Sequence, residues 1–194
     1  MYDLPTSIEV DDIEFHIRND GDFRVILDCF DALSDIELDA DIRVITALII
    51  FLEDINDVED LNKLPDIGKA VAEMYKFFNC GQAESPGATT NRKLIDWNLD
   101  SQLIFSAINN VANKEVRLES YIHWWTFMGY YIAVGESVLS QVVCIRDKSL
   151  KGKKLEKHET EFKRNNPQYF NWNARSIEAQ EADEYVKSIW NSGK

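Results

Sequence analysis

Apolar residues recur at helical spacing in most of this chain, and this periodicity constrains the fold more than any other feature of the sequence. Polar residues that can cap a helix precede the stripes, as Asp39 and Asp41 precede one and Asp100 and Ser101 another. The stripes predict helices over residues 23–33, 45–55, 67–78, 104–111 and 138–145. A chain with this pattern folds into a mainly α-helical structure.

The N-terminal residues follow a different period. Apolar and polar residues alternate over residues 13–18, which is typical of a strand with one buried face. A shorter apolar pair, Ile8 and Val10, precedes them, and Asp11-Asp12 between the two runs favours a turn. We therefore expect a mainly α, compact helical domain with a short N-terminal β-hairpin.

Charge is distributed unevenly along the 194 residues, whose net charge is −13. Residues 1–62 hold 18 acidic and 3 basic side chains, whereas residues 146–194 hold 8 acidic and 11 basic ones. Residues 148–164 contain few large apolar side chains and predict a solvated or partly disordered helix. We divide the chain into a helical core domain with the N-terminal hairpin, residues 1–147, and a C-terminal part, residues 148–194. The latter holds a basic helix, an aromatic loop and a C-terminal amphipathic helix.

The sequence lacks the patterns of export and of membrane insertion. Its N-terminus has neither the basic nor the apolar region of a signal peptide. The longest nearly unbroken apolar run, residues 44–52, is too short to cross a bilayer of about 30 Å. Cys29, Cys80 and Cys144 are far apart and odd in number, so they indicate neither a metal site nor a disulfide framework. We expect a soluble intracellular protein with reduced thiols and no membrane partner.

Residue patterns that carry chemistry are also missing. His16, His123 and His158 lie in three different segments, and none has a second histidine or cysteine at metal-ligand spacing. Asp31, Asp35 and Asp39 follow one another at i,i+4 spacing, but a solvated acidic face accounts for them. Serine-nucleophile motifs, phosphate loops and dinucleotide fingerprints do not occur. We therefore expect no enzyme activity, no cofactor and no metal.

One segment combines basic and aromatic residues. Residues 146–157 are rich in lysine, and Tyr169, Phe170 and Trp172 follow, which is a combination found in proteins that bind single-stranded nucleic acid. Acidic residues interrupt the segment, and the net charge of the chain repels phosphate. A solvated helix, or a tail that contacts an acidic protein partner, is favoured over binding of nucleic acid.

The most unusual feature is a run after Ser120 that is apolar on every side of a predicted helix, from Tyr121 to Val134. Its adjacent Trp124 and Trp125 point about 100° apart on a helix, so one packing face does not bury both. Two interpretations stay open. The run is a central helix enclosed on two sides, or one tryptophan is core and the other anchors a partner.

Several segments resemble a family of small proteins from tailed phages and prophages of Gram-positive bacteria that are described as tail assembly chaperones. The most specific match is His123-Trp124-Trp125 before Phe127, followed by a helix that closes on Ile145-Arg146 and by a lysine-rich segment. Residues 13–35 and 95–111 also match the pattern. The resemblance spans residues 8–160 with gaps, and residues 165–194 extend past it.

The resemblance implies a phage tail assembly chaperone that binds the tape-measure protein and keeps it soluble during tail-tube assembly. It implies partnership with other tail assembly proteins, a place in the host bacterial cytoplasm and absence from the mature virion, and it leaves self-association open. It supplies no catalytic residues. The alternatives are a structural tail or connector protein retained in the virion, and a nucleic-acid-associated phage regulator. Candidate partner-binding residues are Trp124, Trp125, Phe127, Tyr131, Arg146, Tyr169, Phe170 and Trp172.

Overall fold

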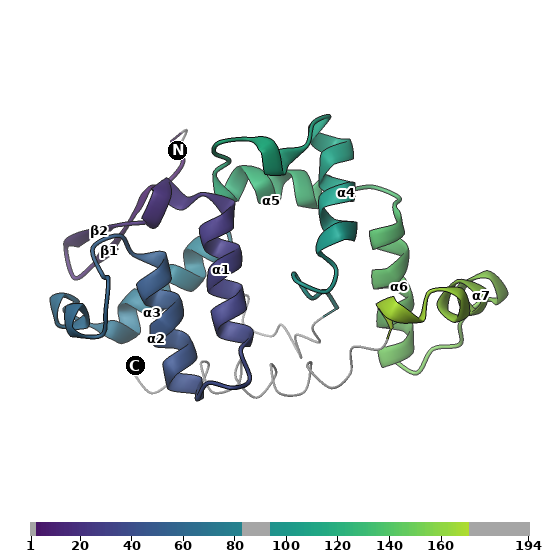
Figure 1. The fold of residues 1–194 in the computed structure, drawn as a ribbon, viewed down its shortest axis with the longest axis horizontal. Helices are drawn as coiled ribbons and strands as arrows, with labels where there is room; N and C mark the ends of the chain where they lie inside the picture. The colour runs from purple at the N-terminus through teal and green to yellow at the C-terminus, as the bar shows by residue number, and fades with distance from the viewer. Residues whose placement is uncertain (1–2, 83–93, 171–194) are drawn as a thin grey trace. The chain divides into compact units, whose positions relative to one another are not determined.

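The computed structural model describes residues 3–82 and 94–170 (Figure 1). Over these residues the chain forms a short antiparallel hairpin and then α-helices, which confirms the expected fold class. The strands are β1 (Ser7–Val10) and β2 (Ile13–His16). The helices are α1 (Phe23–Ser34), α2 (Ala40–Phe51), α3 (Ile67–Phe78), α4 (Ser101–Ala112), α5 (Trp124–Ile132), α6 (Val138–Leu150) and α7 (Lys157–Asn165). None of the helices in these ranges is long and apolar enough to span a membrane.

The described residues form two compact units. Unit 1 contains residues 3–82 and 121–128, and unit 2 contains residues 94–120 and 129–170. The division differs from a simple cut along the chain, because the His-Trp-Trp segment belongs with the N-terminal residues. The expected boundary at residues 147 and 148 stays a prediction, and the expected C-terminal amphipathic helix lies outside the described residues.

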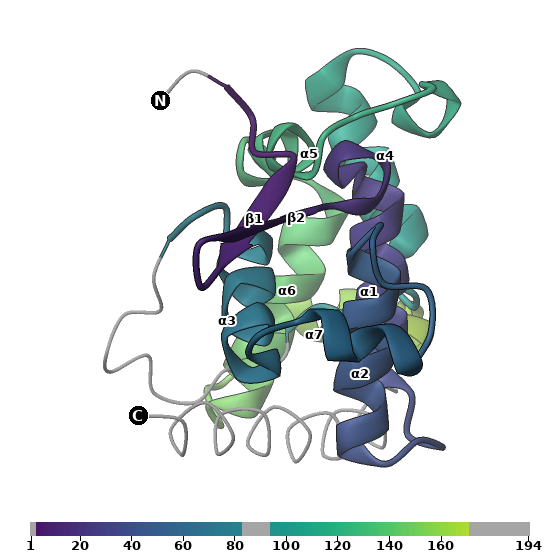
Figure 2. The same cartoon turned by 90° about the vertical axis from the view of Figure 1, so that its left-hand side faces the viewer.

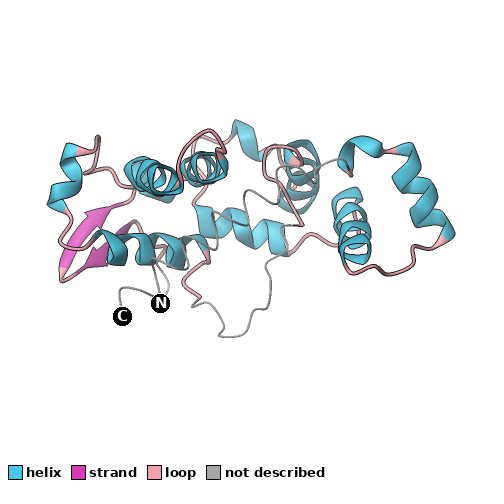
Figure 3. Ribbon diagram, turned by 90° about the horizontal axis from the view of Figure 1, so that it is seen from below, coloured by secondary structure: helices cyan, strands magenta, loops and turns pink. Residues whose placement is uncertain are grey.

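The hairpin lies in unit 1, and Figure 3 shows its two strands in magenta. Ile8 pairs with Phe15 across the strands. The two turn residues, Asp11 and Asp12, have φ values of 50° and 64°. Positive φ at both positions is what a two-residue type I′ turn requires, and this turn matches the twist of the flanking strands. The buried side of β1 packs on α3, beside which it lies in Figure 2.

Helices α1 and α2 pack against each other in unit 1. The prediction that the second helix reaches Ile55 is wrong, because α2 ends at Phe51. The physical reason is Arg18, whose guanidinium donates hydrogen bonds to the carbonyls of Ile49, Ile50, Leu52 and Ile55. These bonds satisfy carbonyls that a helix leaves free at its C-terminus, so the chain can turn while Ile55 stays buried.

The core of unit 1 is aromatic. The rings of Phe23 and Phe127 stack with centroids 4.5 Å apart, and Phe30 meets Trp124 edge to face at 5.6 Å. Phe51 contacts Phe78 in the same edge-to-face manner. Such pairs add directional contacts to the burial of large apolar surfaces, so they fix how the helices pack.

The core of unit 2 lies between α4 and α6. Ile108 on α4, and Val142 and Ile145 on α6, are fully buried. Helix α6 begins with a capping box formed by Ser137 and Ser140, and it continues past the predicted end at Ile145 to Leu150. The predicted end was wrong because Arg146 lies on the buried face of the helix and so continues that face.

The prediction that residues 148–164 form a single solvated or partly disordered helix is wrong. Helix α6 ends at Leu150, Gly152 turns the chain with φ +64°, and α7 follows. Glu159 closes the capping box of α7 by accepting from the backbone N–H of Glu156. Its other carboxylate oxygen accepts from Lys148 at 2.6 Å, so the buried Glu159 ties α7 to α6.

Candidate partner-binding site

The His-Trp-Trp segment is held by the residues that start α1. Phe23 N–H donates to the carbonyl of Ile122, and Ile122 N–H donates to Asp22 Oδ2 at 2.9 Å. The other carboxylate oxygen of Asp22 accepts from the Arg24 N–H and caps α1. These bonds keep residues 121 and 122 out of the helix, so α5 begins at Trp124. The prediction that the helix begins directly after Ser120 is therefore wrong.

The two adjacent tryptophans both bind the end of α3. Trp124 Nε1–H donates to the carbonyl of Phe78, and Trp125 Nε1–H donates to the carbonyl of Phe77, each at 2.9 Å. These carbonyls lie in the last turn of α3, whose carbonyls lack a regular i+4 donor, although the Phe77 carbonyl also accepts from the Cys80 N–H at 3.0 Å. The two indoles therefore act as a C-terminal cap, which is a structural role for the pair.

The two tryptophans differ in exposure. Trp124 is 1% exposed, whereas Trp125 keeps an intermediate exposed fraction. Trp125 covers Gly81, whose φ is +78° and where an added Cβ would lie 3.1 Å from the indole. Of the pair, Trp125 alone thus retains a surface that a partner can reach.

His123 directly precedes α5 and orients Trp125. Its Nδ1 accepts from the Trp125 N–H at 3.0 Å, and its Nε2 lies 3.0 Å from the carbonyl of Pro5. This pair of partners requires the neutral ring with the proton on Nε2. Burial lowers the pKa of His123, against smaller opposing effects of the Pro5 carbonyl and Asp20. The ring is a structural link, since both of its nitrogens are used.

The remaining candidates on α5 lie in different environments. Phe127 is fully buried in the core of unit 1. Tyr131 belongs to unit 2, where its ring lies 5.4 Å from that of Trp97 and is partly exposed. Burial, and to a lesser extent the nearby Asp100, raises the pKa of the Tyr131 hydroxyl.

Arg146 is the centre of a buried ion pair. Its Nη1 and Nη2 donate to the two carboxylate oxygens of Asp100 at 2.6 and 2.9 Å, and both side chains are at most 1% exposed. Its remaining donors reach the carbonyls of Leu94 and Tyr169. The guanidinium thus joins the segment before α4, helix α6 and the residues after α7. Its burial leaves no surface for a partner in this conformation.

The aromatic residues after α7 are only partly gathered. Tyr169 offers its backbone carbonyl to Arg146, and its side chain is partly exposed. Phe170 meets Phe162 edge to face at 6.3 Å, and the Lys163 ammonium lies 5.7 Å from its ring centroid. Trp172 lies outside the described residues. Of the candidates in the described residues, Trp124, Phe127 and Arg146 are buried, so these three do not contribute to an exposed surface.

Sequence reasoning missed the partners that give these residues their roles. Asp100 was recognised only as a helix cap, yet its carboxylate bonds Arg146 and the Asp96 N–H. The helical phase could have shown that Arg146 is buried, because it follows Val142 by four residues and so falls on the buried face of α6. No comparable signal exists for Arg18, whose four carbonyl partners lie more than thirty residues away in sequence.

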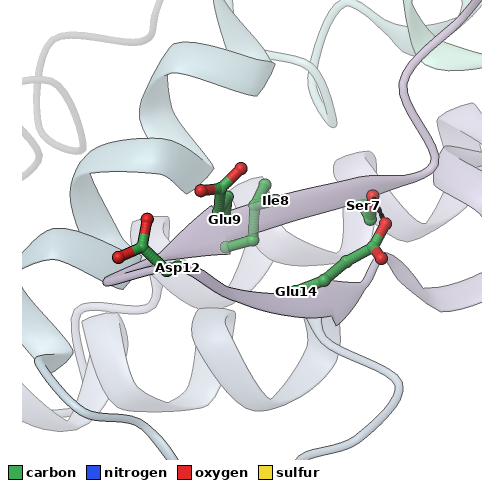
Figure 4. A pocket seen from close by; sticks show the side chains of 5 residues that line it. All are labelled: Ser7, Ile8, Glu9, Asp12 and Glu14. Atoms are coloured by element: carbon green, nitrogen blue, oxygen red, sulfur yellow. Dashed lines mark hydrogen bonds between the residues drawn. The ribbon is translucent and has the colours of Figure 1, made fainter.

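A shallow depression of about 450 Å³ lies along the hairpin. Figure 4 shows the Ser7 hydroxyl, which donates to Glu14, and the separate carboxylates of Glu9 and Asp12 beside them. Glu9 and Glu14 are register partners, so two like charges face each other there. Within residues 3–82 and 94–170, no group of histidine, cysteine or acidic side chains is arranged to hold a metal ion.

Comparisons with known proteins give one match. The model of the family described as Bacteriophage Gp15 protein matches residues 1–170, which is most of the chain. No curated protein and no solved structure matches.

Proposed function

Because the chain belongs to the Bacteriophage Gp15 protein family, we propose that it acts as a phage tail assembly chaperone. In this role it binds the tape-measure protein in the host cytoplasm, keeps it soluble while the tail tube assembles, and leaves before the virion matures. The observation that carries the proposal is the family match over residues 1–170, together with the His-Trp-Trp and Ile-Arg segments on which the resemblance rests.

The surface of the described residues supports a protein partner. Large apolar side chains are exposed on both units, among them Ile36 and Ile42 on unit 1 and Leu118 and Ile132 on unit 2. A chaperone for long amphipathic helices needs apolar contacts of this kind and no catalytic constellation. We accordingly propose a binding protein without enzyme activity.

The basic segment gives less support to a nucleic-acid partner. Arg146 pairs with Asp100, Lys148 with Glu159 and Lys151 with Asp147. In these ion pairs, acidic side chains neutralise three of the basic residues that could otherwise contact phosphate. The proposal therefore involves no nucleic acid.

Co-expression with the tape-measure protein of the same phage tests the proposal. The fraction of tape-measure protein in the soluble lysate should rise when this chain is present, and the two should elute together from a size-exclusion column. An unrelated acidic protein of similar mass is the control for a general effect of expression. An unchanged soluble fraction would contradict a chaperone role, and recovery of this chain in purified virions would favour the structural tail protein instead.

A further inference from the structure

The outer edge of β1 carries backbone groups that the hairpin does not use. Ile17 N–H donates to the Thr6 carbonyl, so these two residues are a hydrogen-bonded pair of the ladder. Because such pairs alternate along antiparallel strands, the N–H and C=O groups of Ser7 and Glu9 point away from β2. Within residues 3–82 and 94–170, these groups form no further hydrogen bond. An edge of this kind is a template for pairing with another strand.

The open edge is confined to β1. On β2, His16 N–H donates to Asp54 Oδ2, and the His16 carbonyl accepts from the Glu53 N–H. Before β1, Pro5 has no N–H to offer, and its carbonyl lies 3.0 Å from His123 Nε2. The hairpin therefore presents one short edge, which ends at the turn on one side and at bonded residues on the other.

The face of the hairpin beside this edge is negatively charged. Glu9 and Glu14 are register partners, and Asp12 lines the same shallow depression, as Figure 4 shows. None of the three carboxylates forms an ion pair with a residue that the structure describes. Like charges directly opposite each other on two strands are destabilising, so a cation beside Glu9 on a third strand relieves a repulsion already present.

We propose that the outer edge of β1 binds an extended, antiparallel segment of a partner protein that carries lysine or arginine at every second residue. The residue opposite Glu9 exchanges both backbone hydrogen bonds with it, and its side chain lies on the same face, with the Cβ atoms about 5 Å apart. The N–H groups of the cationic residues thus point to β1, and those of the residues between them point away. Backbone pairing supplies affinity, and the cations supply selectivity. This surface does not depend on the proposed function.

Titration of the isotope-labelled full chain with short peptides, followed by nuclear magnetic resonance, tests the inference. One peptide of about eight residues alternates lysine with threonine, and a second has glutamate in place of lysine. The lysine peptide should shift the amide signals of Ser7 and Glu9, because these groups become donors to it. Its dissociation constant should be at least about tenfold lower than that of the glutamate peptide. Equal binding of the two peptides, or shifts confined to other residues, would overturn the inference.

Methylation of peptide nitrogens separates backbone pairing from charge attraction without altering the protein. N-methyl groups on the lysines remove the donors that face β1, whereas N-methyl groups on the threonines remove donors that face solvent. Both peptides keep the charge. The first modification should weaken binding at least about tenfold, and the second less than about threefold. Any other pattern would overturn the antiparallel pairing proposed for this edge.

A matched pair of variants tests the role of charge in the protein. Glu9→Gln should weaken the lysine peptide about fivefold, while the melting temperature should not fall, since the variant removes a like-charge pair. Glu37→Gln removes the same charge at another exposed position of unit 1 and should change binding less than about twofold. Equal losses in the two variants would show a general field effect and overturn the assignment to this edge.

Two further outcomes separate the inference from its alternatives. Sedimentation that shows dimers of the chain alone, dissociated by the lysine peptide, would overturn it in favour of edge-to-edge pairing between two copies. No assay here uses the tape-measure protein. Specific binding of the lysine peptide by a chain that fails to keep the tape-measure protein soluble would therefore support the inference and contradict the proposed function.

Discussion

Replacing Arg146 by methionine should lower the free energy of unfolding of unit 2 by about 3–5 kcal/mol. The guanidinium donates five hydrogen bonds, two to the Asp100 carboxylate and three to the carbonyls of Leu94 and Tyr169. Methionine fills similar space but donates none of them. The Asp100 side chain, which is fully buried, then lacks its cation, and each carbonyl left without a donor costs about 1–3 kcal/mol.

Hydrogen exchange of the full chain, read by mass spectrometry in increasing urea, measures this loss where it occurs. Peptides from α4 and α6 report on unit 2, and peptides from α1, α2 and α3 report on unit 1. The matched control is Arg117→Met, since Arg117 forms a pair with Glu115 that solvent screens. Protection in α4 and α6 should fall much further for Arg146→Met than for Arg117→Met.

A double substitution tests whether the cost arises from the ion pair. Asp100→Asn removes the buried charge and keeps an oxygen that can accept from Asp96 N–H. Combined with Arg146→Met, it should cost less than the sum of the two single changes by about 1–3 kcal/mol, because no charge is left buried alone. Additive costs, or an Arg146→Met cost no larger than the Arg117→Met control, would refute the reasoning.

Three other predictions follow from the contacts of unit 1. Trp124→Ala should cost about 3–5 kcal/mol in chemical denaturation, because it empties a core position, and Trp125→Ala should cost distinctly less. The free energy of unfolding should fall as pH drops below about 6.5, because burial lowers the pKa of His123 in the fold and the unfolded chain takes up the proton first. In melting curves recorded at several pH values, His123→Gln should remove this dependence of stability on pH. The control His158→Gln, at an exposed position, should leave the dependence in place. Gly21→Ala should cost about 2–4 kcal/mol by urea titration, since φ is +77° and a Cβ would lie 2.7 Å from the Phe77 ring.

The positions of the helices could be predicted from local sequence. The apolar stripes at 23–33, 67–78 and 104–111 each fall within a helix, and aspartate side chains cap the first two of these helices. The alternating N-terminal residues form the hairpin. These elements follow from side-chain periodicity, which local sequence contains. Their ends were less certain where a distant group decides them, as Arg18 does for α2.

The candidate site could be predicted only in part. The two-sided burial of residues 121–134 was one of the two interpretations of the apolar run, and the structure gives Trp124 and Trp125 unequal exposure. Residue type alone did not show that Arg146 would be buried, because its partners Leu94, Asp100 and Tyr169 come from three separate segments. A surface rich in aromatic and basic residues and a buried structural network have the same composition, and only the fold separates them.

The contacts of the His-Trp-Trp segment bear on where a partner binds. Both indole N–H groups are used by carbonyls at the end of α3, and the histidine ring uses both of its nitrogens. A segment committed in this way defines the fold of unit 1, so the resemblance that rests on it points to the fold before it points to a binding surface.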